Sequence, residues 1–82
     1  MECTIMAIAI NPRTKAAPTV QEILTKHGCI IKTRLGLHEA SESTCSQRGL
    51  ILLQLRQDAD TIDELKTDLT NIDGVTVNTM VI

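Results

Sequence analysis

The sequence contains no Phe, Tyr or Trp among its 82 residues. Proteins that bind single-stranded nucleic acids stack bases on aromatic side chains beside clustered Lys and Arg. Here the basic residues are scattered and the formal net charge is −2, which argues against direct nucleic-acid binding. Glycine and proline are also scarce, at 4 and 2 residues, and the glycines stand apart. This excludes a phosphate-cradling glycine-rich loop and a disordered linker.

No apolar run is long enough to cross a membrane, and the N-terminus lacks the pattern of a signal peptide. Three cysteines, an odd number, fit reduced thiols better than a disulfide framework. We interpret Cys3 and Cys29 as small buried hydrophobic residues. These features predict a cytoplasmic protein with no membrane association. The length predicts one domain, 1–82, with a core so small that a partner subunit would stabilise it.

The same local pattern occurs twice. A helix-like segment ends at Gly28 and another at Gly74, and each continues into an alternating β pattern. An apolar, strand-like run precedes each helix-like segment, so the order reads βαββαβ. This order predicts an α+β fold of the ferredoxin-like type, a sandwich in which two helices cover one face of a four-stranded antiparallel sheet.

The first helix is predicted over roughly 16–27 by apolar residues at helical spacing. Pro18 suits the first turn of a helix, where a missing N–H group costs no hydrogen bond. Gly28 is predicted to end the helix in the left-handed backbone conformation. His27 is explained by its place in the last turn, because an imidazolium favours the negative helix end.

The second helix is predicted over about 61–72. Its first four residues, Thr61-Ile-Asp-Glu64, have the spacing of a capping box, and an apolar stripe follows them. Gly74 then ends the segment.

Four strands complete the predicted fold, over 3–10, 29–38, 50–56 and 75–82. The second and fourth strands alternate between apolar and polar residues, which is typical of edge strands, whereas the first and third are apolar on both faces and belong in the centre. The sheet face opposite the helices is therefore rich in aliphatic residues. We expect self-association through this face, through strand edges, or both, to give a homodimer or homotetramer.

Several segments together carry a family resemblance: AIAIN at 7–11, VQEILTKHG at 20–28, RLGL at 34–37, RG at 48–49 and IDGVTV at 72–77. Over nearly the whole chain, this ordered set resembles the small proteins called putative iron-only hydrogenase system regulators. Those proteins are similar in fold to ACT domains and to the C-terminal domain of the nickel-responsive repressor. The resemblance implies an ACT-like, dimeric or tetrameric regulatory protein rather than an enzyme.

The sequence departs from the ACT pattern in two places. The turn after the second strand is lengthened to 38–47, and the glycine that commonly contacts the ligand after the first strand is absent from 11–14. The second departure weighs against amino-acid binding.

Two groups of residues are candidate ligand-binding positions. Asn11, Arg13 and Thr14 lie at the start of the first helix, where backbone N–H groups and a guanidinium can receive a carboxylate or phosphate. The family resemblance implies an effector near this loop, at a subunit interface; the alternative is an ordinary polar loop. Arg34 and Gly36 are predicted on the open face of the second strand, where solubility, an interfacial ion pair or a bulge explains them equally well.

A third group, in the lengthened turn 38–47, is a candidate metal site. His38 and Cys45, flanked by Glu39 and Glu42, offer ligands for Ni²⁺, Zn²⁺ or Cu²⁺, and a second subunit would complete the shell, as in the nickel-responsive repressor. No established metal motif accompanies them, so a solvated loop is the competing interpretation.

The leading hypothesis is a small oligomeric ACT-like regulator of an iron-only hydrogenase system that binds a small-molecule effector or a protein partner at subunit interfaces. Ligand binding would shift the oligomer between packing arrangements. Two alternatives stay open: a metal sensor that uses the 38–47 turn, and an assembly module without a ligand. No catalytic residue and no cofactor is predicted, because only His38 lies near the candidate nucleophiles and no orienting residue accompanies it.

Overall fold

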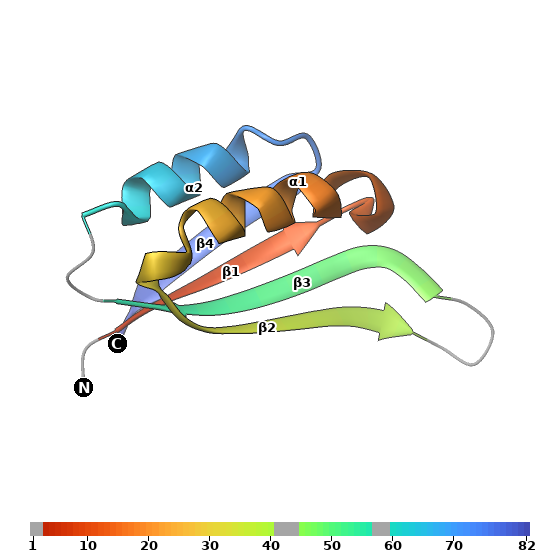
Figure 1. Ribbon diagram of the computed structural model, residues 1–82. Helices are drawn as coiled ribbons and strands as arrows, with labels where there is room; N and C mark the ends of the chain where they lie inside the picture. Colours follow the sequence, from red (N-terminus) through yellow and green to blue (C-terminus); the bar gives the residue numbers. More distant parts are fainter. Residues whose placement is uncertain (1–2, 41–44, 57–59) are drawn as a thin grey trace.

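The computed structural model describes residues 3–40, 45–56 and 60–82, which form a four-stranded antiparallel sheet with both helices on one face (Figure 1). The elements are β1 (Thr4–Ile10), α1 (Arg13–Lys26), a 3-10 turn (Gly28–Ile30), β2 (Ile31–Ala40), β3 (Cys45–Leu55), α2 (Ile62–Thr70) and β4 (Val75–Val81). The strand order is β2-β3-β1-β4. The predicted ferredoxin-like βαββαβ fold, with the first and third strands in the centre, is confirmed. Within the described residues, no helix is long and apolar enough to span a membrane.

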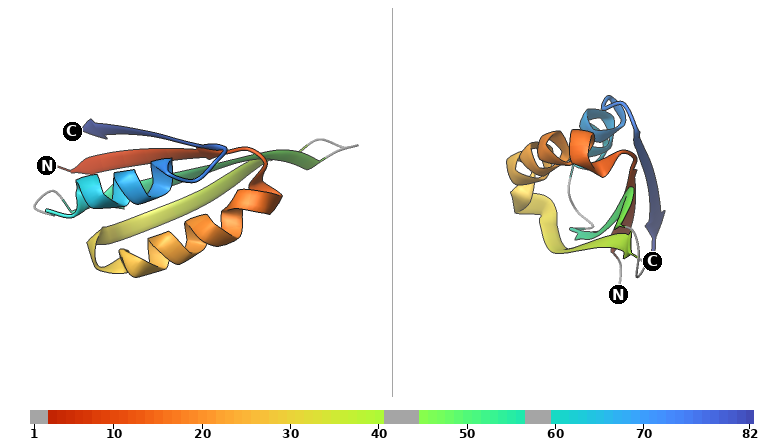
Figure 2. Two further views of the ribbon diagram at one scale, coloured as in Figure 1. Left: turned by 90° about the horizontal axis from the view of Figure 1, so that it is seen from above. Right: turned by 90° about the vertical axis from the view of Figure 1, so that its right-hand side faces the viewer.

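The core lies between the helices and one face of the two central strands. Met6 of β1 pairs with Leu53 of β3, and directly paired residues of antiparallel strands point to the same face. Both side chains are almost fully buried. Figure 2 shows the two helices lying together on this side of the curved sheet. The buried cluster comprises Met6, Ile8, Ile10, Ala16, Val20, Leu24, Ile30, Ile51, Leu53, Leu55, Leu65, Leu69 and Val77.

The helices differ in detail from their predicted form. Helix α1 begins at Arg13, so Pro18 lies inside the helix instead of in its first turn. Pro18 is exposed, which keeps its ring away from the core. The predicted capping box is not formed in α2, because the Thr61 side chain makes no capping hydrogen bond. The Thr61 backbone carbonyl accepts a hydrogen bond from the Leu65 N–H at 2.9 Å.

The two glycines at the helix ends behave differently. Gly74 has a φ of +84°, as a left-handed residue requires, whereas Gly28 begins the 3-10 turn without a positive φ. The predicted left-handed stop at Gly28 is therefore wrong. This turn also displaces Cys29 from the predicted strand and leaves it exposed, while Cys3 is buried as expected.

An irregularity at Lys32 in β2 changes which side chains face the helices. Ile31 pairs with Leu55, but Thr33 already pairs with Gln54, so one residue of β2 is inserted between two successive pairs. Beyond it, Arg34 pairs with the buried Leu53. Arg34 and Gly36 therefore lie on the helix-facing side, and their predicted placement on the open face is wrong.

The lengthened turn is a paired hairpin rather than a 38–47 loop. In the backbone register His38 pairs with Gly49, and Ala40 pairs with Cys45. Strands β2 and β3 thus extend into the polar segment and take up most of it. The alternation of apolar and polar residues does not predict this extension, because strand formation there depends on pairing with the neighbouring strand. The side chains of residues 37–40 and 45–47, and all of 41–44, lie outside the described residues.

Among Gly28, Gly36 and Gly74, replacement by alanine should destabilise the fold most at Gly74. An added Cβ would collide with the Asn11 carbonyl oxygen, and the positive φ adds backbone strain. We expect Gly74→Ala to lower the free energy of unfolding by about 1 to 3 kcal/mol in urea titrations.

Gly36→Ala is the matched control, because nothing lies within 4 Å of a Cβ built there. It should change the free energy of unfolding by no more than about 0.5 kcal/mol. Equal effects of the two substitutions would contradict the account of Gly74.

Candidate functional site

A pocket lies at the junction of β1 and α1. The Asn11 N–H donates to the Gly74 carbonyl at 2.9 Å, which holds the end of β1 against the start of β4. Pro12 then occupies the N-cap position of α1, after a cis Asn11–Pro12 peptide bond, and its carbonyl accepts from the N–H groups of Lys15 and Ala16. These contacts place the first turn of α1 across from the turn that connects α2 to β4.

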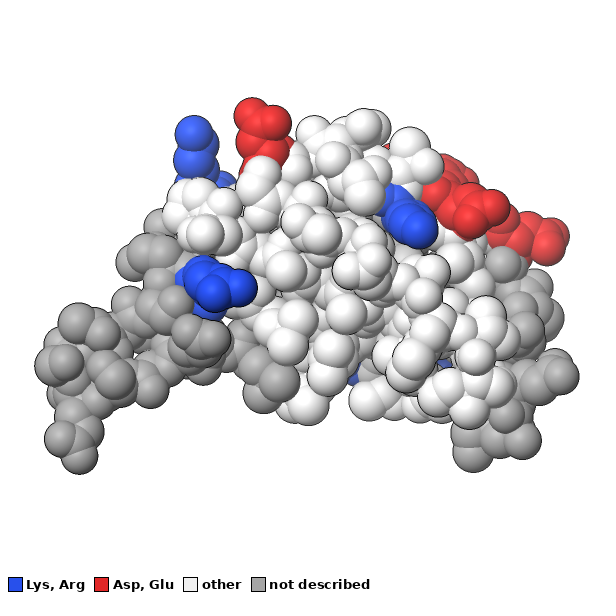
Figure 3. All heavy atoms as spheres, turned by 180° about the vertical axis from the view of Figure 1, so that it is seen from behind, with Lys and Arg blue, Asp and Glu red and all other residues white. Residues whose placement is uncertain are grey.

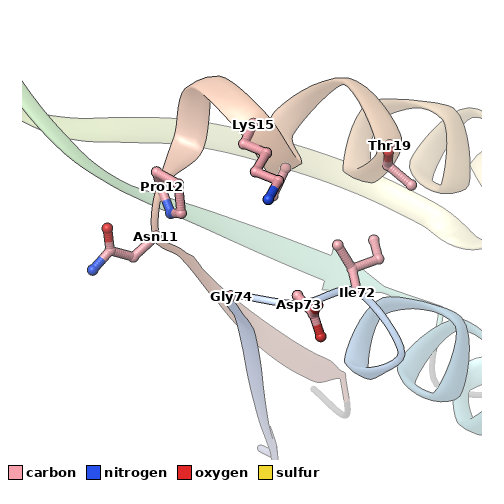
Figure 4. A pocket seen from close by; sticks show the side chains of 8 residues that line it. Asn11, Pro12, Lys15, Thr19, Ile72, Asp73 and Gly74 are labelled. Atoms are coloured by element: carbon pink, nitrogen blue, oxygen red, sulfur yellow. The ribbon is translucent and has the colours of Figure 1, made fainter.

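The pocket between these two segments has a volume of about 420 Å³. Lys15 and Thr19 come from α1, and Ile72 and Asp73 from the opposite turn; Figure 4 shows the Lys15 side chain extending toward that turn. Ala16, which is buried, provides apolar surface. The complete lining is Asn11, Pro12, Lys15, Ala16, Thr19, Ile72, Asp73 and Gly74.

The electrostatics of the pocket favour an anionic group at one end. The N-cap of α1 has no side-chain hydrogen bond and the first turn contains no acidic residue, so the positive end of the helix dipole is not offset there. Lys15 adds a full positive charge. On the opposite side, the Asp73 carboxylate can accept a hydrogen bond from a ligand donor.

Of the residues predicted at this end, Asn11 does line the pocket, although its amide points away from Lys15 and Thr19 (Figure 4). Arg13 and Thr14 occupy the first turn of α1, and their side chains lie outside the described residues.

The other predicted positions lie elsewhere. Arg34 donates a hydrogen bond from Nη2 to Gln21 Oε1 in the middle of α1, and neither Arg34 nor Gly36 lines the pocket. Gly36 pairs regularly with Ile51 and has no close backbone neighbour, so the bulge and the close approach considered for it are wrong. The candidate metal ligands His38 and Cys45 stand on paired strands, and their side chains lie outside the described residues.

A second polar cluster lies at the other end of the helix pair. His27, with a side chain only 6% exposed, donates from Nε2 to Asp68 Oδ2 at 2.9 Å. Lys26 Nζ lies 3.3 Å from the same oxygen and 3.9 Å from Glu64 Oε1. His27 thus bridges α1 to α2, which goes beyond its predicted role at a helix end.

The pKa of Asp68 is lowered by this cluster from its ordinary value of 3.8. The hydrogen bond from His27 is the largest cause, and the hydrogen bond from Lys26 is the next. Both donors stabilise the ionised carboxylate in the folded state.

Sequence reasoning missed the pocket residues Lys15, Thr19 and Asp73, and also the contact between His27 and Asp68. Residues so far apart in the sequence come together only when the helices pack antiparallel. One local signal was available, because Glu64 and Asp68 stand four residues apart and so share a helix face.

The TM1266-like family model, described as "Iron-only hydrogenase system regulator, putative", matches residues 2–79. The structure of the uncharacterized protein TM1266 from Thermotoga maritima is similar, with a TM-score of 0.82 and 31% sequence identity, covering 100% of this chain and 99% of that one. A search of curated proteins found no match.

Two more distant structures share the fold alone. CPII, a nitrogen regulatory PII-like protein from Thiomonas intermedia K12 bound to ADP, AMP and bicarbonate, has a TM-score of 0.62 and 11% identity, covering 100% of this chain and 93% of that one. A formyltetrahydrofolate deformylase from Pseudomonas putida KT2440 has a TM-score of 0.59 and 14% identity, covering 95% of this chain but 28% of that one.

Asp68 generates a prediction about stability and pH. Because its folded-state pKa lies below the unfolded value, its contribution is present above the unfolded pKa and is lost as the pH falls through the folded pKa. We expect Asp68→Asn to melt at a lower temperature than the wild type at pH 7, and the difference to shrink below pH 3.8. Thermal unfolding at a series of pH values measures this difference, and a gap that persists unchanged at low pH would contradict the prediction.

Proposed function

The chain belongs to the TM1266-like family of iron-only hydrogenase system regulators, and on this premise we propose that it is a homo-oligomeric regulatory domain, 1–82, that binds a small anionic effector near a subunit boundary. A regulatory role of this kind needs no catalytic residue. The observation that carries the proposal is the sheet face opposite the helices, which presents exposed apolar side chains and is not covered by either helix.

The residues of this open face follow from the strand register. Leu50 and Leu52 of β3 lie beside Ala9 and Ala7 of β1, and no helix covers them. The paired residues of the register place these side chains on the face: Ile5, Ala7, Ala9, Thr33, Leu35, Leu50, Leu52, Gln54, Thr76, Asn78 and Met80. None of these paired residues is charged, although a sheet face that stays in water normally carries polar and charged residues.

The exposed apolar side chains of the open face lie on three different strands. Leu35 of β2 is 52% exposed, Leu50 of β3 is 37% exposed and Met80 of β4 is 58% exposed. Figure 3, which looks at the molecule from the side of β4, shows a broad area without charged groups, while carboxylates gather over α2. Exposed apolar side chains on a face without charge at its paired residues favour burial against a second copy of the chain.

The effector is proposed to bind in the pocket between α1 and the turn before β4. Lys15 and the start of α1 would receive its carboxylate or phosphate, and Ala16 and Ile72 would contact an apolar part. Asn11, Arg13 and Thr14, the predicted ligand-binding residues, stand at this same start of α1.

The pocket is connected to the open face through β4. Gly74 lines the pocket, and the strand that begins one residue later carries Thr76, Asn78 and Met80 on the open face. A ligand that shifts the turn at Gly74 would displace this edge strand and so favour one packing arrangement of the subunits over another. The regulatory output would then be a change in what the oligomer binds.

Substituting Leu50 tests the role of the open face. We expect Leu50→Glu to convert the wild-type oligomer into monomers, because an interface would have to bury the new carboxylate without a partner. Leu50 is already 37% exposed, so the subunit fold should tolerate the change. Size-exclusion chromatography with light scattering measures the subunit number, and circular dichroism confirms folding.

Val81→Glu is the matched control, with an equally drastic change at a residue that is 66% exposed. Val81 pairs with Thr4, on the helix-facing side of the sheet, and should leave the subunit number unchanged. Dissociation by Val81→Glu alone would place the contact at the β4 edge, and a wild-type monomer would contradict the proposal altogether.

A further inference from the structure

The cluster that joins α1 to α2 has the composition of a metal site. His27 offers an imidazole nitrogen, and Glu64 and Asp68 each offer a carboxylate oxygen. These ligand atoms all lie within 4.8 Å of one another. Imidazole and carboxylate together are ligands that Zn²⁺ and neighbouring divalent transition metals accept.

We propose that His27, Glu64 and Asp68 bind a divalent transition-metal ion of the Zn²⁺ type. Three protein ligands leave a coordination position for water or for a group from another molecule. The site is separate from the predicted pair His38 and Cys45, and it contains no thiolate.

The ligand spacing fits an ion after small side-chain movements. Bonds of about 2.0 to 2.2 Å place neighbouring ligands of a tetrahedral ion roughly 3.4 Å apart. His27 Nε2 and Asp68 Oδ2, now 2.9 Å apart, would separate slightly, and the wider spacings would close. Glu64 is 56% exposed and can rotate, whereas the buried His27 ring stays in place. On binding, the neutral imidazole would carry its proton on Nδ1 and present the Nε2 lone pair to the metal.

The position of Lys26 shows that this spot attracts a cation. Its ammonium group lies between the two carboxylates, at 3.3 Å from Asp68 Oδ2 and 3.9 Å from Glu64 Oε1. A metal ion would have to displace this ammonium, whose 61% exposure leaves it free to turn into solvent. Lys26 therefore competes with the metal. Removing its charge should strengthen metal binding, an effect that a cluster with only a structural role would not show.

An ion at this site would clamp the two helices together. His27 follows the last residue of α1, while Glu64 and Asp68 stand one turn apart on α2. The proposed effector pocket lies at the opposite end of α1, around its first turn. Metal binding would thus join the end of α1 to α2 without occupying the pocket at the start of α1.

The test is calorimetric titration of the metal-free full chain with Zn²⁺, followed by titration with Co²⁺. We expect one Zn²⁺ per chain, and at least tenfold weaker binding in both Glu64→Gln and Asp68→Asn. Lys26→Gln should bind about three- to tenfold more tightly, because a nearby positive charge is removed. The Co²⁺ complex should lack a thiolate-to-metal charge-transfer band.

Matched controls separate this site from other metal ligands. Asp63→Asn removes an exposed carboxylate from the same helix, and Cys29→Ser and Cys45→Ser remove thiols; all three should bind Zn²⁺ as the wild type does. Glu64→Gln changes an exposed residue, so its result stands even if Asp68→Asn is unstable. Absence of Zn²⁺ binding, or binding that survives Glu64→Gln and disappears in a cysteine variant, would overturn the proposal.

Discussion

The pairing register between β1 and β3 is the constraint on which the rest of this structure depends. It places Met6 beside Leu53 and Ile8 beside Ile51 on the face that both helices cover. A slip of one residue would turn these side chains to the other face and expose the core to water. The same register fixes the opposite face, where neither helix covers the apolar residues of the central strands.

Much of this arrangement could be predicted from the sequence, because buried strands and amphipathic helices leave periodic patterns. The faces of β1 and β3 follow from alternation alone, and the doubled order of elements identifies the fold. Strand β2 was harder, since the inserted Lys32 exchanges the two faces, and alternation contains no sign of where a bulge falls. The hairpin around 38–47 was missed because polar residues that pair as strands resemble a loop.

The polar clusters at the two ends of the helix pair were beyond sequence reasoning for a different reason. Each joins residues about forty or more positions apart, such as His27 and Asp68, which meet only through tertiary packing. At one end, a helix start and Lys15 favour an anion; at the other end, carboxylates gather around a cation. The helix pair therefore carries two polar clusters, one that favours an anion and one that favours a cation. The far face of the sheet has no charged side chain among the residues that the register pairs there.

The central claim is that this far face is buried between copies of the chain and that a small effector binds close by. Native mass spectrometry of the untagged wild-type protein, isolated gently and without chelator, tests it most directly. The account predicts the mass of two or four chains together with a retained small anion that is lost in Lys15→Gln. A bare monomer, with neither a partner subunit nor a bound molecule, would contradict it.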